Sequence, residues 1–134
     1  MLAALFCAAC GSTGGGSSAP GTFSGAPVAN VVSDSGAVHM AAWTSPNPIE
    51  RGEVALQLNA LDAKGAPLDG VTMSAVPWMP AMGHGASTVP TVTAKGNGIY
   101  ELTNVNLFMP GHWEIRIAMS GTITDKTVLA FDVP

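Results

Sequence analysis

Cysteine is almost absent from this sequence, and its two thiols stand close together near the start. Cys7 and Cys10 are followed by 124 residues without another cysteine. Residues 11–134 therefore cannot form a disulfide, bind a metal through thiolate or use a cysteine nucleophile. A blue-copper electron carrier, which needs a cysteine ligand, is excluded for this part of the chain.

Charged residues and long apolar runs are also scarce. Charged side chains make up 10% of the residues, with five Lys and Arg against nine Asp and Glu and a net charge of −4. No basic surface is available to hold phosphates, so we expect no nucleic-acid partner. No apolar run approaches the ~20 residues that a membrane-spanning helix needs.

Catalytic patterns are missing as well. Serines are frequent, but none lies in a nucleophile-elbow pattern with a partnered histidine and acid. Only three histidines occur, which is few for a copper oxidase or monooxygenase. We therefore expect that the protein is not an enzyme.

The first residues are typical of export rather than of a folded domain. An apolar start leads to Ala8-Ala9-Cys10-Gly11, which resembles the end of a bacterial lipoprotein signal, and a Gly/Ser-rich tether follows. The alternative, a Cys7–Cys10 redox or metal pair, normally lies at the start of a helix in a folded domain. We predict that residues 1–36 are a signal remnant and tether, that Cys10 carries a lipid, and that the protein is an exported, periplasmic or outer-surface lipoprotein that reaches the membrane only through this anchor.

The remainder, residues 37–134, alternates apolar and polar residues with a period of two. Gly, Pro and Asn interrupt the pattern every eight to twelve residues, and no window shows helical spacing with caps. This favours an all-β fold, an antiparallel β-sandwich of about seven strands, two of them at residues 38–43 and 88–94. The expected buried residues are Leu56, Tyr100, Trp113 and Ile115.

Two segments depart from the alternation and combine Met and His with Pro and Gly. They are Pro77 to Gly85 (PWMPAMGHG) and Leu107 to Trp113 (LFMPGHW). Thioether sulfur is a soft, neutral ligand that selects Cu(I), and imidazole binds Cu(I) or Cu(II). We expect loops that bind copper, with Cu(I) favoured and Cu(II) possible. The candidate ligands are Met79, Met82, His84, Met109 and His112.

Other interpretations of these residue types remain open. Methionine often fills cores, and Met40, Met73 and Met119 lie at strand positions where packing is the better interpretation. The loop positions of Met79, Met82 and Met109 seldom offer a deep core site. His112 is equally well an exposed surface histidine, and His39 could join the site only from an edge strand.

The order of these motifs resembles the YtkA-like family, which is related to FixH-type domains. The similarity covers about residues 38–134 and rests on a Gly-turn strand (PIERGEV, residues 48–54), MPAMGH (79–84), GIY (98–100) and MPGHWEI (109–115). It implies an immunoglobulin-like sandwich in an exported bacterial protein associated with copper handling or oxidase assembly. It also implies Met79, Met82, His84 and Met109 as metal ligands.

Together these features predict an exported copper-binding protein that transfers or sequesters copper, with a cuproenzyme or an oxidase-assembly factor as its partner. The alternative is a surface lipoprotein whose sandwich binds another protein without a metal. Whether the Met and His side chains of the two loops converge discriminates between the two hypotheses.

Overall fold

The computed structural model describes residues 23–134, and the predicted lipidation site Cys10 lies outside this range. The described residues form nine β-strands and no helix. None of these residues lies in a helix long and apolar enough to cross a membrane. The strands are β1 (Ala29–Val32), β2 (Val38–Ser45), β3 (Gly52–Asp62), β4 (Val71–Met79), β5 (His84–Gly85), β6 (Thr91–Gly96), β7 (Ile99–Leu107), β8 (Gly111–Gly121) and β9 (Asp125–Val133).

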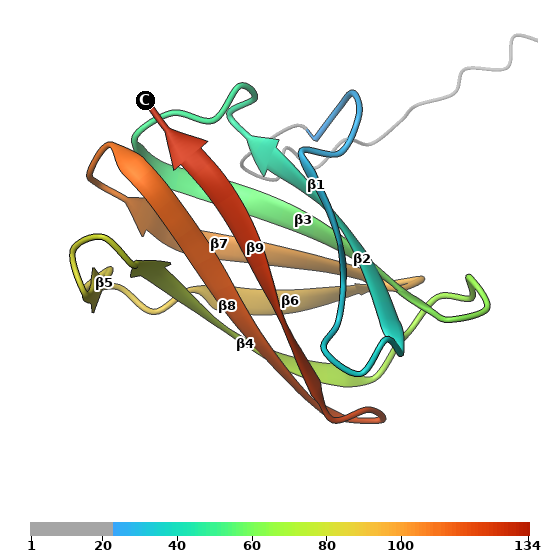
Figure 1. Cartoon of the computed structure of the whole chain (residues 1–134). Helices are drawn as coiled ribbons and strands as arrows, with labels where there is room; N and C mark the ends of the chain where they lie inside the picture. Colours follow the sequence, from blue (N-terminus) through green and yellow to red (C-terminus); the bar gives the residue numbers. More distant parts are fainter. Residues whose placement is uncertain (1–22) are drawn as a thin grey trace, which may run out of the picture.

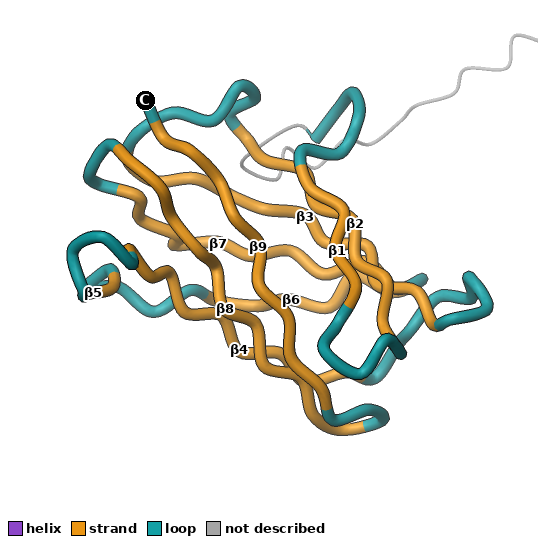
Figure 2. Tube along the Cα trace, viewed as in Figure 1, coloured by secondary structure: helices purple, strands orange, loops and turns teal. Residues whose placement is uncertain are grey.

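The strands form two sheets that pack face to face (Figure 1). One sheet has five strands in the order β1-β2-β3-β7-β6, and the other has four in the order β5-β4-β8-β9. All neighbouring strands are antiparallel. Loops and tight turns make every connection, as the tube view shows (Figure 2). The predicted all-β antiparallel sandwich is confirmed.

The core lies between the two sheets, because alternate residues of each long strand point inward. In β4 and β8 the buried and exposed residues alternate along almost the whole strand. All four predicted core residues are buried: Leu56, Trp113 and Ile115 are fully buried and Tyr100 is 1% exposed. The period-two pattern of the sequence thus identified the inward-facing side chains correctly.

Strand number and boundaries differ in places from the sequence prediction. Nine strands replace about seven, because the short β1 and β5 carry too few residues to show an alternation. The sandwich also begins before the predicted boundary at residue 37, since β1 at residues 29–32 pairs with β2. The strand expected at residues 88–94 begins at Thr91, after Pro90.

Strand β4 continues through a proline, which the sequence analysis had placed at the start of a loop. Pro77 is buried in register opposite Ile115 of β8. Its carbonyl accepts a hydrogen bond from the backbone N–H of Ala86 at 3.3 Å, on the side away from β8. Its missing N–H would also point to that side, where no long strand needs it. The inward alternation that starts at Val71 therefore extends to Met79.

Candidate functional site

A tight turn joins β4 to the two-residue strand β5 and carries most of the first Met/His segment. The carbonyl of Met79 accepts hydrogen bonds from the backbone N–H groups of Met82 at 3.1 Å and Gly83 at 3.0 Å. Gly83 has a φ of +65°, in the left-handed region that favours glycine. The turn fixes His84 directly opposite Met79, so both side chains lie on the same, inward face of the hairpin.

Met79 itself is a core residue at the end of β4, and the expectation that its position offers no deep core site was wrong. Its side chain is 4% exposed and belongs to the central apolar cluster. The extended backbone through Pro77 is the reason, because it places Met79 in phase with the other inward-facing residues of β4. Met79 therefore lies beneath the turn, whereas Met82 lies on it and is 52% exposed.

The second Met/His segment forms the loop between β7 and β8, and it lies beside the first. The ring of Phe108 in this loop stacks on His84, with centroids 6.2 Å apart and an interplanar angle of 12°. Phe108 also contacts Trp113: the two rings meet edge to face, with their centroids 5.6 Å apart. The expected proximity of the two loops at one end of the sandwich is thus present, on the left side of Figure 1.

Met109 follows Phe108 and is half-buried against the core. Its carbonyl accepts a hydrogen bond from the indole Nε1–H of Trp113 at 2.9 Å. A fully buried aromatic residue therefore holds the backbone of the loop that presents Met109.

Gly111, at the start of β8, provides the space that Met79 fills. A Cβ at this position would lie 2.7 Å from the Cε methyl of Met79, and the glycine has a φ of +127°. The end of the Met79 side chain therefore lies directly against the second segment. Met79 of β4 and His84 of β5 thus lie beside the β7–β8 loop that carries Met109.

The two remaining histidines are placed elsewhere. His112 points to the outer face of the four-stranded sheet, since its neighbour Trp113 points inward. Its Nδ1 lies 3.0 Å from Oδ1 of Asp132. His39 is exposed on β2, opposite Leu61, at the other end of the sandwich. The structure therefore separates both histidines from the inward-facing Met79 and His84.

The ring of His84 presents one nitrogen for a ligand. Its Nδ1 lies 3.3 Å from the carbonyl oxygen of Gly85. A carbonyl can only accept, so this contact favours the tautomer with hydrogen on Nδ1 and leaves the lone pair of Nε2 available. The possible metal ligands at this end are thus thioethers and an imidazole, a set that suits Cu(I).

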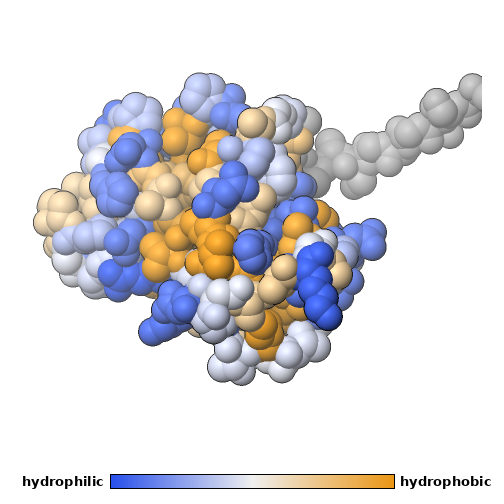
Figure 3. All heavy atoms as spheres, turned by 45° about the vertical axis from the view of Figure 1, so that its right-hand side comes forward, coloured by the Kyte–Doolittle hydropathy of each residue, from blue (hydrophilic) through white to orange (hydrophobic). Residues whose placement is uncertain are grey.

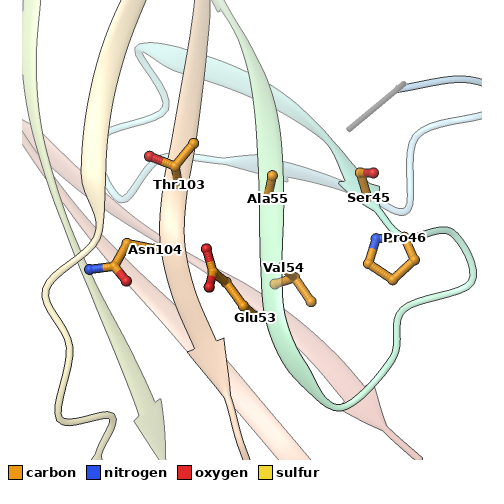
Figure 4. A pocket seen from close by; sticks show the side chains of 7 residues that line it. All are labelled: Ser45, Pro46, Glu53, Val54, Ala55, Thr103 and Asn104. Atoms are coloured by element: carbon orange, nitrogen blue, oxygen red, sulfur yellow. The ribbon is translucent and has the colours of Figure 1, made fainter. Parts of the chain in front are cut away.

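Sites built from harder or charged ligands are not found in residues 23–134. No group of three or more His, Cys, Asp or Glu side chains in this range is arranged to hold a metal ion. A cleft of about 300 Å³ lies on the five-stranded sheet, where the Glu53 carboxylate points between β3 and β7 (Figure 4). Its other lining residues carry no charge, so this cleft offers a single carboxylate.

Sequence reasoning identified the two segments but missed the residues that hold them together. Phe108 and Gly111 were treated only as parts of a loop, although Phe108 contacts His84 and Gly111 accommodates Met79. Their only sequence signal is position: each lies within two residues of Met109.

Comparison with known proteins places these features in a wider group. The model of the YtkA-like family matches residues 34–118. A copper-bound variant of FetP from uropathogenic Escherichia coli has a similar fold, with a TM-score of 0.55 and 11% sequence identity over 83% of this chain and 98% of that chain. A comparison with curated proteins finds no match.

Proposed function

Because the chain belongs to the YtkA-like family, we propose that it is an exported, non-enzymatic copper-binding protein that transfers or sequesters copper through the Met/His end of the sandwich. One observation carries this proposal: two segments about 30 residues apart bring His84 and Phe108 into ring contact, with Met79 and Met109 beside them. The copper-bound state of the structurally similar FetP variant supports the choice of metal.

The burial of the side chains suggests different roles for the ligands. Met82 is half-exposed on the turn, where it can meet an incoming or departing ion. His84 and Met109 are partly buried and lie deeper. Met79 is buried below them, so its sulfur would serve as the innermost ligand. A graded set of neutral ligands suits transfer, because a partner protein can displace them one at a time.

A Cu(I) titration of the purified protein against a competing chelator tests the site. We expect Met82→Leu and His84→Gln each to weaken Cu(I) binding strongly, and the double variant Met79→Leu/Met82→Leu to weaken it by orders of magnitude. The fold should survive these changes, because leucine and methionine have similar volumes. Met119→Leu is the matched control, since Met119 is a buried core residue of β8 at the other end of the sandwich.

The same variants separate the two oxidation states. His84→Gln should reduce Cu(II) binding more than Cu(I) binding. The reason is that the other three proposed ligands, Met79, Met82 and Met109, are thioethers, and imidazole is the only good Cu(II) ligand in the set. If the Met79→Leu/Met82→Leu variant binds Cu(I) as tightly as the parent protein, these methionines serve packing alone and the proposal fails.

Localisation is part of the proposal and has its own test. We propose that Cys10 carries the lipid that attaches the exported protein to a bacterial membrane. Mass spectrometry of the native protein should find a mature chain that begins at a lipidated Cys10, and Cys10→Ser should release the protein into the soluble fraction. A mature chain with an unmodified Cys10 would remove the anchor but leave the copper site untouched.

A further inference from the structure

The outer face of the four-stranded sheet carries an ordered pattern of apolar and charged side chains. We use "outer face" for the side chains of β4, β8 and β9 that point away from the core. Its members are Thr72, Ser74, Val76, Trp78, His112, Glu114, Arg116, Ala118, Ser120, Lys126, Val128, Ala130 and Asp132.

This outer face is hollowed and partly apolar. A groove of about 540 Å³ crosses it, lined among others by Val76, Trp78, Arg116 and Val128. Val76 is 51% exposed and Val128 is 43% exposed, so two β-branched side chains meet solvent across the groove. Figure 3 shows a contiguous apolar area with hydrophilic residues around it on the side of the molecule turned toward the viewer. Exposed apolar area of this kind is typical of an interaction surface.

Strand register arranges the outer face in rows that run across the sheet. One row holds Trp78, Glu114 and Ala130, and the next holds Val76, Arg116 and Val128. Charges therefore change sign along the strands. On β8 the acidic Glu114 is followed by the basic Arg116.

The same reversal occurs at the margins of the outer face. On β9, Asp132 lies in the row of His112, and Lys126 lies in the row of Ala118. Asp132 and Lys126 are both strongly exposed, at 89% and 76% of their side-chain area. Asp132 is thus at one end of the face, beside His112, and Lys126 is at the other, where its Nζ lies 3.9 Å from Oδ2 of Asp34.

A second copy of the chain complements this pattern. Consider a two-fold axis in the plane of the face that runs across the strands, between the Glu114 row and the Arg116 row. This axis places a second copy on the face with its rows in the reverse order. Glu114 then meets Arg116 of the second copy, and Asp132 meets Lys126 of the second copy. Trp78 meets Val76, and Ala130 meets Val128. These four kinds of opposing pair are either oppositely charged or apolar, as an isologous interface requires, and His112 lies opposite Ala118 of the second copy.

We propose that the outer face of the four-stranded sheet joins two copies of this protein in a symmetric, face-to-face dimer. Arg116 is prepared for this contact by its own chain. Its Nε lies 3.1 Å from Glu114, and its guanidinium lies 4.8 Å from the centroid of the Trp78 ring. A guanidinium has five donors, so Arg116 can bind a second carboxylate while it keeps the first. The proposed ligands Met79, Met82, His84 and Met109 are not part of this pattern, so the dimer does not depend on copper.

Sedimentation of the full chain without copper tests the proposal through charge reversal. The parent protein should show a concentration-dependent dimer. Arg116→Glu alone places two acidic pairs in the interface and Glu114→Arg alone places two basic pairs, so each variant should raise the dimer Kd at least tenfold. Lys64→Glu is the control: it changes the net charge as much as Arg116→Glu does, from an exposed turn outside the outer face, and should leave the Kd unchanged.

Mixing the two single variants gives the decisive result. Each variant alone has lost the Glu114–Arg116 pair within its own chain, so only contacts between chains can be restored by mixing. An equimolar mixture of Arg116→Glu and Glu114→Arg should form heterodimers with a Kd close to that of the parent dimer. A parent protein that stays monomeric up to millimolar concentration, or a mixture that stays monomeric while both variants remain folded by circular dichroism, overturns the proposal.

Discussion

The two ends of the sandwich are fastened in different ways. At the end away from the Met/His segments, side chains donate to or accept from loop backbones repeatedly. The Tyr100 hydroxyl donates to the carbonyl of Leu68 at 2.8 Å and accepts from the N–H of Val71 at 3.2 Å. Asp125 accepts hydrogen bonds from Ser33 and Ser35 and so ties the β1–β2 turn to β9.

The Met/His end joins its two Met/His segments mainly by ring packing, although Asn104 and Thr88 also fasten the loop after β5 through hydrogen bonds to backbone carbonyls. Its two loops meet through the rings of His84, Phe108 and Trp113, and one side-chain hydrogen bond, from Trp113 to Met109, joins ring and loop. A polar side chain that is already engaged in a structural hydrogen bond is not available to bind a metal ion. The comparison indicates that one end is built for rigidity, whereas the other leaves thioether and imidazole groups available.

The largest loss of stability is expected from Trp113→Phe, at the Met/His end. The smaller ring leaves part of a fully buried site empty and loses the hydrogen bond to the Met109 carbonyl. We expect a loss of roughly 2–3 kcal/mol in the free energy of unfolding. Chemical denaturation measures the stability, and the Cu(I) titration should show weaker binding because the Met109 loop is released. Unchanged copper affinity in a destabilised variant would mean that Trp113 does not position this loop.

A smaller loss of stability is expected at the opposite end from Tyr100→Phe. The change removes one hydroxyl and leaves the Val71 N–H without its partner, so we expect a loss of about 1–2 kcal/mol in the free energy of unfolding. Cu(I) affinity should not change, because the Tyr100 hydroxyl and its partners lie at the opposite end of the sandwich from the Met/His segments. A parallel loss of copper affinity would show that the two ends are coupled and would break the comparison.

The smallest loss of stability is expected from Asp125→Asn, and its size depends on pH. Hydrogen bonds from the hydroxyls of Ser33 and Ser35, with further ones from backbone N–H groups, lower the pKa of Asp125 from 3.8 to about 2. Because this pKa is lower in the folded protein than in the unfolded chain, the ionised carboxylate stabilises the fold at pH values above about 4. This contribution is lost as the pH falls from about 4 to about 2. Denaturation curves should therefore show Asp125→Asn less stable than the parent at pH 7, with a gap that narrows toward pH 2. A gap that is constant over this range would assign the effect to geometry rather than to charge.

Much of the fold could be predicted from the sequence, because the inward residues of the long strands are almost all apolar and many of the outward residues are polar. Leu56 and Ile115 were identified on this basis. The β1 and β5 strands could not be predicted, since two to four residues give no reliable period. Their pairing depends instead on neighbours that are distant in the sequence.

The candidate site could be predicted only in part. Residue chemistry pointed to Met79 and His84, but their depth depends on whether the chain stays extended through Pro77, and local rules favour a break there. The contact between His84 and Phe108 depends on which strands are neighbours, and the alternation of polar and apolar residues does not specify that order. The sequence leaves His112 open between a metal ligand and an exposed surface histidine, and the structure places it on the outer face beside Asp132.

Pro77 also has a consequence for how the protein behaves in a crowded compartment. Strand β5 covers only the last part of β4, so most of that strand forms an edge where a foreign strand could add. A strand that added along the free part of β4 would reach Pro77, where Ala86 already binds the carbonyl and no N–H is present, so its ladder of hydrogen bonds would end there. The residue that carries Met79 into the core therefore also protects the sheet against aggregation, and a variant with a β-branched residue in its place should form insoluble, strand-rich assemblies more readily than the parent protein.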